Sequence, residues 1–261
     1  GVTHVLHMAA VKESPDLAMD VGVKGMFHLL EAFRAEGGRQ FILIGGDCSV
    51  GHIFHDYGAP VTEDSPRRAY PGVYALTKVM EEVMLEQFGI QYDLGYTILR
   101  APWIMEKDDF RHALSFGSAQ FGGPAWDGLL GADQIEKATQ ECLIPLMLDT
   151  YGRSLKRSFI HVSDLVQAIG DVLDNEAARC QLFNVCMDEP VDYGEVAVYL
   201  KAAKALSSIT IPTPYFGNWL SNSKAKHILG WAPVVGYEDM IERAWSYVRP
   251  ANDPRKIWYP G

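Results

Sequence analysis

Two residues four positions apart, Tyr74 and Lys78, carry the clearest chemical signal in the sequence. On a helix this spacing places both side chains on one face. A tyrosine phenol, with a pKa of about 10, is a poor base at neutral pH. An ammonium about 4 Å away, at an effective dielectric of about 20, favours the phenolate by about 4 kcal/mol, or roughly three pKa units. We therefore expect the pair to transfer protons. Such a spacing also arises by chance, so the motifs elsewhere in the sequence decide whether it is functional.

Arg157 is the predicted binding group for an anionic substrate, because a guanidinium holds a phosphate or carboxylate through two parallel hydrogen bonds. The alternative is an arginine in solvent. Trp103 follows the predicted strand that ends at Arg100, and it belongs either to a substrate pocket or to the hydrophobic core. We expect His7 and His161 to be structural.

Composition excludes several classes of function. The chain of 261 residues has 33 acidic and 23 basic residues and a net charge of −10, without a dense Lys/Arg block, so a nucleic-acid partner is not expected. There is no apolar run of membrane-spanning length and no signal-peptide pattern, so we expect no membrane association and a cytoplasmic location. Scattered cysteines argue against a metal site: Cys48, Cys142, Cys180 and Cys186.

The elements around Tyr74 alternate between strand and helix. A buried strand is expected over 2–10, a helix from Ser14 to Glu36, a strand over 41–44, a helix over 73–88 and a strand over 92–99, with a Pro- and Gly-rich loop at 51–72. This rhythm predicts βαβ units and a parallel sheet. Residues 105–140 have no clear pattern. Beyond them we expect strands at 158–162 and 182–186, and helices reaching 173, at 194–206 and at 238–248.

Several further motifs occur in order along the chain, and together they resemble the extended short-chain dehydrogenase/reductases, the NAD-dependent epimerase/dehydratase family. Residues 74–78 are similar to the Tyr-x-x-x-Lys motif of that family. The other segments are 6–10 (LHMAA), 21–32 (VGVKGMFHLLEA), 157–164 (RSFIHVSD), 183–191 (FNVCMDEPV) and 223–233 (SKAKHILGWAP).

The resemblance implies an α/β fold with a Rossmann-type parallel sheet and a small, interleaved C-terminal substrate lobe. It places the partial NAD(P)-binding domain at 1–104 and 157–187, and the substrate lobe at 105–156 and 188–261. The chain opens at what resembles the fourth strand and contains no Gly-x-x-Gly-x-x-Gly. The first strands and the Gly-rich cofactor loop are therefore expected upstream of Gly1, and a chain without them should bind NAD or NADP very weakly.

The resemblance also assigns roles to residues. Tyr74 would be the acid/base, and Lys78 would hold the ribose hydroxyls of NAD or NADP and lower the pKa of Tyr74. The nicotinamide half would lie near both of them and near Met8, Ala9, Ala10, Pro102 and Trp103, while Trp103 and Arg157 would contact substrate.

Three positions depart from the family pattern. The usual third catalytic Ser or Thr aligns with Gly46, so Ser49, Asp47 or no residue fills that role. Gly22 stands where the family usually has Asn, which weakens a hydrogen bond inside the site. Ser158 replaces the usual Asp.

The predicted function is an NAD(P)-dependent oxidoreductase, epimerase or dehydratase acting on a sugar, sugar nucleotide or similar hydroxylated small molecule. The alternatives are a non-catalytic binding or regulatory protein derived from the family, and an inactive truncated fragment. The helices that carry Met26, Met80 and Met84 usually form the family's dimer interface, so a homodimer is expected.

Overall fold

A parallel four-stranded sheet forms the centre of the first half of the molecule. The computed structural model describes residues 1–11, 14–58, 60–116 and 125–254. The sheet has the order β1-β2-β3-β8, from β1 (His4–His7), β2 (Gln40–Gly46), β3 (Tyr96–Ala101) and β8 (Gln181–Asn184). All three neighbouring pairs run parallel, so the predicted α/β fold is confirmed.

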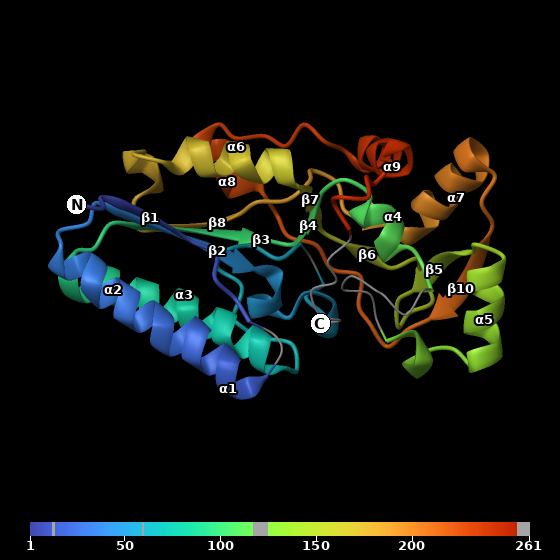
Figure 1. The fold of residues 1–261 in the computed structure, drawn as a ribbon, viewed down its shortest axis with the longest axis horizontal. Helices are drawn as coiled ribbons and strands as arrows, with labels where there is room; N and C mark the ends of the chain where they lie inside the picture. The colour runs from blue at the N-terminus through green and yellow to red at the C-terminus, as the bar shows by residue number, and fades with distance from the viewer. Residues whose placement is uncertain (12–13, 59, 117–124, 255–261) are drawn as a thin grey trace.

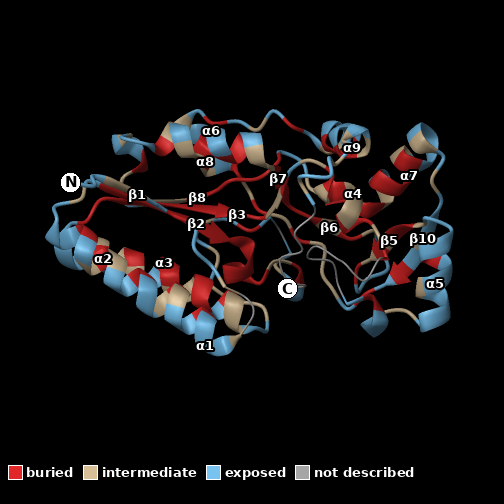
Figure 2. Cartoon of the chain, viewed as in Figure 1, coloured by how far each residue is buried: buried red, intermediate tan, exposed pale blue. Residues whose placement is uncertain are grey.

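Helices cover both faces of this sheet (Figure 1). On one side lie α2 (Met26–Ala35) and α3 (Val73–Tyr92), and on the other lie α6 (Val162–Val172) and α8 (Ser223–Leu229). Every residue of β2 and β3 is buried, as their apolar runs predict (Figure 2). The prediction of a buried first strand is wrong for β1, because β1 lies at the edge of the sheet and leaves Leu6 exposed.

The helix expected from Ser14 to Glu36 has an irregular middle. It comprises α1 (Pro15–Ala18), a π-helical segment η1 (Met19–Gly25) and α2. The Ser14 hydroxyl accepts a hydrogen bond from the Leu17 backbone amide and so caps the start of α1. The π-helical segment packs against α3 and contains Gly22, one of the three departures from the family pattern.

The second half builds its own core beside the end of the sheet, around small strand pairs. β4 (Trp103–Met105) pairs with β7 (Phe159–His161), β5 (Ile144–Leu148) with β10 (Ser208–Pro212), and β6 (Lys156–Arg157) with β9 (Val191–Asp192). The α-helices are α4 (Asp109–Ala113), α5 (Ala132–Gln140), α7 (Tyr193–Lys204) and α9 (Tyr237–Ser246), and the short 3-10 turns of the chain are η2 (Asp47–Val50), η3 (His52–Phe54), η4 (Trp126–Gly128) and η5 (Glu176–Ala178).

The unpatterned stretch 105–140 thus contains α4, η4, α5 and part of the lobe core, while residues 117–124 lie outside the described residues. The chain later returns to the sheet: Ala225 and Trp231 are buried in the same cluster as Ile42 and Leu99. The assignment of residues 188–261 to the substrate lobe stays a prediction. Within that range, Ala225 and Trp231 pack against the sheet and not against the core of the second lobe. In the described part of the chain, no helix is long and apolar enough to cross a membrane.

Candidate active site

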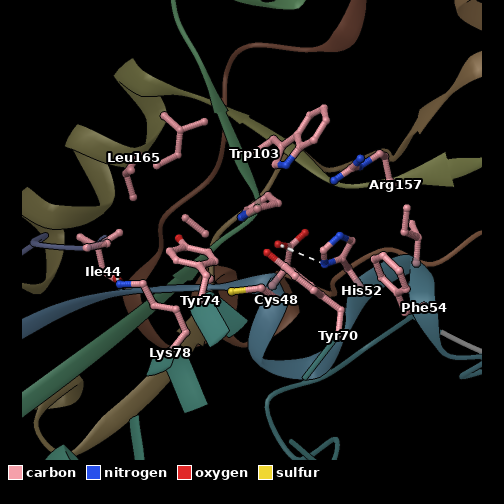
Figure 3. A pocket seen from close by; sticks show the side chains of 18 of the residues that line it. Ile44, Cys48, His52, Phe54, Tyr70, Tyr74, Lys78, Trp103, Arg157 and Leu165 are labelled. Carbon is pink, nitrogen blue, oxygen red and sulfur yellow. Dashed lines mark hydrogen bonds and ion pairs between the residues drawn. The ribbon is translucent and has the colours of Figure 1, made fainter. Parts of the chain in front are cut away.

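A cavity of about 490 Å³ opens at the carboxyl ends of β2 and β3, between the sheet and the second lobe (Figure 3). In open parallel sheets, ligands bind at this end of the strands. Its walls come from the end of β1, the turn after β2, the start of α3, and strands β4, β5 and β6. Lining residues include Met8, Ala10, Ile44, Asp47, Cys48, His52, Phe54, Tyr70, Tyr74, Lys78, Pro102, Trp103, Met147, Arg157, Leu165 and Tyr215.

Tyr74 and Lys78 both face this cavity, one helical turn apart on α3. The Lys78 Nζ lies 6.0 Å from the centroid of the Tyr74 ring. It donates hydrogen bonds to the Ile44 carbonyl oxygen at 3.3 Å and to Glu81 Oε2 at 2.8 Å. An ammonium has three donors, so Lys78 keeps one more for a ligand in the cavity.

The acidity predicted for Tyr74 is wrong for this structure. Burial raises the pKa of Tyr74 well above its ordinary value, and the nearby acidic groups of Cys48, Tyr70, Glu81 and Asp47 raise it further. Burial of the phenol is the main physical reason. The positive charge of Lys78 does not offset it, because that charge is paired with the Glu81 carboxylate 2.8 Å away.

Glu81 is a functional candidate that sequence reasoning missed. It is fully buried, and its Oε1 has no hydrogen-bond partner among the described residues. Burial raises the pKa of Glu81, although the neighbouring Lys78 charge opposes that shift. A Cβ added to Gly22 would lie 3.1 Å from this oxygen, so the small residue in the π-helical segment leaves room for the carboxylate. The available signal was the position of Glu81 three residues after Lys78 on one helix.

The turn after β2 places Asp47 in the cavity and Ser49 outside it. Asp47 Oδ1 lies 3.6 Å from His52 Nδ1, and both side chains are largely buried. The Ser49 hydroxyl donates instead to Glu82 Oε1 at 2.8 Å and to the Gly46 carbonyl at 2.9 Å, and Ser49 is fully buried. Of the two candidates for the third catalytic position, the geometry therefore favours Asp47.

The packing around position 46 explains why the residue there is glycine. A Cβ at this position would lie 2.9 Å from the Cys48 Sγ, so the thiol fills the space that a Ser or Thr at 46 would need. Cys48 and His52 both line the cavity, and neither was predicted as a site residue.

Arg157 is buried in the cavity wall, so the alternative of an arginine in solvent is wrong. Its Cζ lies 3.7 Å from the centroid of the Trp103 ring, a close cation–π contact. Its Nε and Nη2 atoms have no hydrogen-bond partner among the described residues. Both atoms are closed off from solvent in this structure, and the guanidinium also interacts with the buried Tyr193 hydroxyl. Buried donors without partners are costly, so an acceptor that reaches them would stabilise the site.

Most residues predicted to contact a nicotinamide cofactor lie together. Met8, Ala10, Pro102 and Trp103 line the same cavity as Tyr74 and Lys78, whereas Ala9 does not. The remaining donor of Lys78 and the open cavity at the strand ends fit the ribose and nicotinamide half of a dinucleotide. Among the described residues, no group of three or more His, Cys, Asp or Glu side chains could hold a metal ion.

Comparison with known proteins agrees with this geometry. Residues 1–105 match the NAD dependent epimerase/dehydratase family. The family resemblance is confirmed. A short-chain dehydrogenase/reductase superfamily protein from Agrobacterium tumefaciens with bound NAD superposes with a TM-score of 0.78 at 23% identity, covering 94% of this chain and 78% of that one. This likeness shows the same Rossmann-type fold.

Two curated proteins are also similar in sequence. A 3-diazoavenalumate denitrifying reductase from Streptomyces sp is 27% identical over 229 residues, which are 81% of this chain and 66% of that protein. A UDP-glucuronate 4-epimerase from Thermodesulfobacterium geofontis is 22% identical over 271 residues, which are 94% of this chain and 72% of that protein. The chain thus spans about two thirds to three quarters of the length of these relatives.

Proposed function

We propose that this protein is an NAD(P)-dependent oxidoreductase, epimerase or dehydratase that acts on a small anionic molecule at a carbon bearing a hydroxyl or carbonyl oxygen. The observation that carries the proposal is that Tyr74, Lys78 and Arg157 line one cavity at the carboxyl ends of the parallel strands. A match to the epimerase/dehydratase family and a similar structure with bound NAD support it.

Each side chain has a role in this proposal. Tyr74 exchanges a proton with the reacting oxygen of the substrate. Lys78 donates to the cofactor ribose and holds the phenol by its charge, while Arg157 binds the anionic group and so fixes the position of the reacting carbon. The bound nicotinamide supplies the hydride chemistry. Asp47, beside His52, is the proposed third polar group of the site.

Two observations favour a second candidate, a binding protein that has lost catalysis. The raised pKa of Tyr74 and the absence of a hydroxyl at Gly46 both weaken acid/base chemistry in the cavity. Such a protein would still bind the cofactor and the anionic ligand, but it would not turn them over.

Replacement of Tyr74 by Phe separates the two candidates. In the full-length protein, we expect Tyr74→Phe to lower kcat more than tenfold, or about 1.4 kcal/mol of barrier, because the proton donor and acceptor is lost. The measurement is the absorbance of reduced nicotinamide over a panel of hydroxylated acids and nucleotide sugars. Tyr151→Phe is the matched control, since Tyr151 is exposed outside the cavity and its hydroxyl donates to Asp56 Oδ2 at 2.6 Å. Full activity of Tyr74→Phe would refute the acid/base role.

The predicted homodimer is also part of the proposal. Phe27, Leu76 and Val83 are large apolar side chains exposed on α2 and α3, the two helices named for this contact. The assignment of residues 105–156 and 188–261 to a substrate lobe remains a proposal as well.

A further inference from the structure

The lining of the cavity is rich in aromatic rings and lacks the small neutral side chains that often bind sugar hydroxyls. Among the described residues that line it, there is no Ser, Thr, Asn or Gln. A sugar buried in such a cavity would leave several hydroxyls with few partners after losing their water. The polar side chains that are present are the charged Lys78 and Arg157, the Asp47–His52 pair, and the phenol groups of aromatic residues. These aromatic residues are Tyr70, Tyr74 and Tyr215.

Aromatic rings form the wall on the side of Arg157. Figure 3 shows Trp103, His52, Phe54 and Tyr70 around Arg157, with Tyr74, Lys78, Ile44 and Leu165 on the other side of the cavity. Phe54 and Tyr70 stack with ring centroids 5.3 Å apart and planes 29° apart. Tyr215 meets Phe54 edge-on at 5.4 Å. Flat, rigid walls of this kind favour a planar apolar body.

The donors that Arg157 leaves without partners form a definite pattern. Nε and Nη2 are the two nitrogens on one edge of the guanidinium, and their N–H bonds point in the same direction. This edge matches the two oxygens of a carboxylate. Since Lys78 is paired with Glu81, and the Asp47 carboxylate lies on the same cavity, the local charge suits a single negative charge better than a doubly charged phosphate.

Resting on the proposed function, we propose that the substrate is an aromatic carboxylate instead of a sugar. Its carboxylate binds the Nε and Nη2 edge of Arg157, and its ring lies between the aromatic side chains of Trp103, Phe54 and Tyr70. The opposite end of the molecule then points toward Tyr74.

The test is a comparison of ligand affinities in the full-length protein saturated with NAD. Cinnamate and 4-hydroxybenzoate are titrated against glucuronate, galacturonate and UDP-glucose by calorimetry. We expect the aromatic carboxylates to bind at least about tenfold more tightly than the uronates, about 1.4 kcal/mol. Cinnamamide, which keeps the ring and loses the charge, should bind more weakly than cinnamate.

Variants of Arg157 assign the affinity to its guanidinium. Arg157→Gln should weaken the binding of cinnamate about tenfold or more and leave the binding of cinnamamide nearly unchanged. The affinity of Arg157→Lys for cinnamate should be intermediate, because lysine keeps the charge but loses the two parallel donors of the guanidinium. Arg153→Gln is the matched control, since Arg153 is exposed and pairs with Asp149 outside this cavity. If Arg157→Gln does not fold, the affinity ranking of the unaltered protein decides alone.

Preference for a uronate or UDP-glucose would overturn this inference while leaving the proposed function in place. Failure of all aromatic carboxylates to bind an NAD-saturated protein would also overturn it. Failure of the proposed function has a different signature, namely unchanged turnover in Tyr74→Phe.

Discussion

The buried pair of Lys78 and Glu81 determines the electrostatics of the cavity at the scale of single residues. Their charged atoms are 2.8 Å apart, and both side chains are almost completely buried. A buried ion pair of this kind costs desolvation, and its retention calls for a specific role. Here the Glu81 charge is one of the groups that raise the pKa of Tyr74. We therefore propose that Glu81 is a positioning residue that acts on Tyr74 directly and through Lys78.

The substitution Glu81→Gln tests this role. It keeps the shape and removes the negative charge, so the pKa of Tyr74 should fall. In the direction in which Tyr74 accepts a proton, the acidic limb of the pH profile of kcat/KM should move to lower pH. Glu86→Gln, two turns along α3 from Lys78 and paired with Arg67, should leave the limb in place. An unchanged limb in Glu81→Gln would show that its charge does not act on Tyr74.

Residue-level prediction from sequence succeeded where motif and geometry coincide. Tyr74, Lys78 and Arg157 were named from their spacing and context, and they do line one cavity. Glu81 was missed because a glutamate three residues after a lysine usually marks an exposed helix face. Ser49 was misplaced because the 3-10 turn over Asp47–Val50 directs its hydroxyl toward Glu82, and no periodicity encodes such a turn.

At the scale of elements, α3 is fixed to the sheet by a second buried carboxylate. Glu82 Oε1 and Oε2 accept hydrogen bonds from Arg100 Nε at 3.1 Å and Nη2 at 2.8 Å. Arg67 and Ser49 donate to the same carboxylate at 2.8 Å each. One side chain thus joins α3, β3, the turn after β2 and the 51–72 loop, and this holds the Tyr74 face of α3 toward the cavity.

We expect Glu82→Gln to lower the free energy of unfolding by about 3 kcal/mol or more, because it leaves the buried Arg100 without its charge partner. Urea denaturation measures this loss. Glu86→Gln should cost no more than about 1 kcal/mol, since that ion pair is partly exposed. Equal effects of the two variants would contradict the bridging role of Glu82.

The same carboxylate predicts a pH dependence of stability. Burial alone would raise the pKa of Glu82, but the charge and hydrogen bonds of Arg100, with those of Arg67 and Ser49, bring it below its ordinary value. A depressed folded-state pKa gives stability that is present above the unfolded-state value of about 4.3 and is lost as the pH falls through the folded-state value. In Glu82→Gln, the free energy of unfolding measured by urea denaturation should therefore fall less between neutral and acidic pH than it does in the unaltered protein.

The elements near the sheet could be predicted, and those beyond it only in part. The strands and helices of the βαβ units follow from apolar runs and helical periodicity, as β2, β3 and α3 show. The π-helical segment was not expected, because Val23 and Met26 recur at a spacing that an ordinary helix also gives. The 105–140 stretch stayed unassigned because its short helices are held by the core of the second lobe, not by a strong local pattern.

At the scale of the whole molecule, two cores meet at the cavity. One core lies on the two faces of the sheet, the other fills the second lobe, and the cavity takes its walls from both. The return of α8 and Trp231 to the sheet is a contact between distant parts of the chain, which local sequence pattern does not encode. The family motif at 223–233 indicated an element there, but not the face on which it packs.

Binding of nicotinamide cofactors to the full-length protein tests the central claim most directly, namely that the cavity beside Lys78 is a cofactor and substrate site. NADH and NADPH are titrated by calorimetry into the unaltered protein and into Lys78→Met. We predict saturable binding of at least one cofactor, weakened about tenfold or more by Lys78→Met through loss of a charged donor. Binding of neither cofactor, or equal affinity in Lys78→Met, would contradict the account.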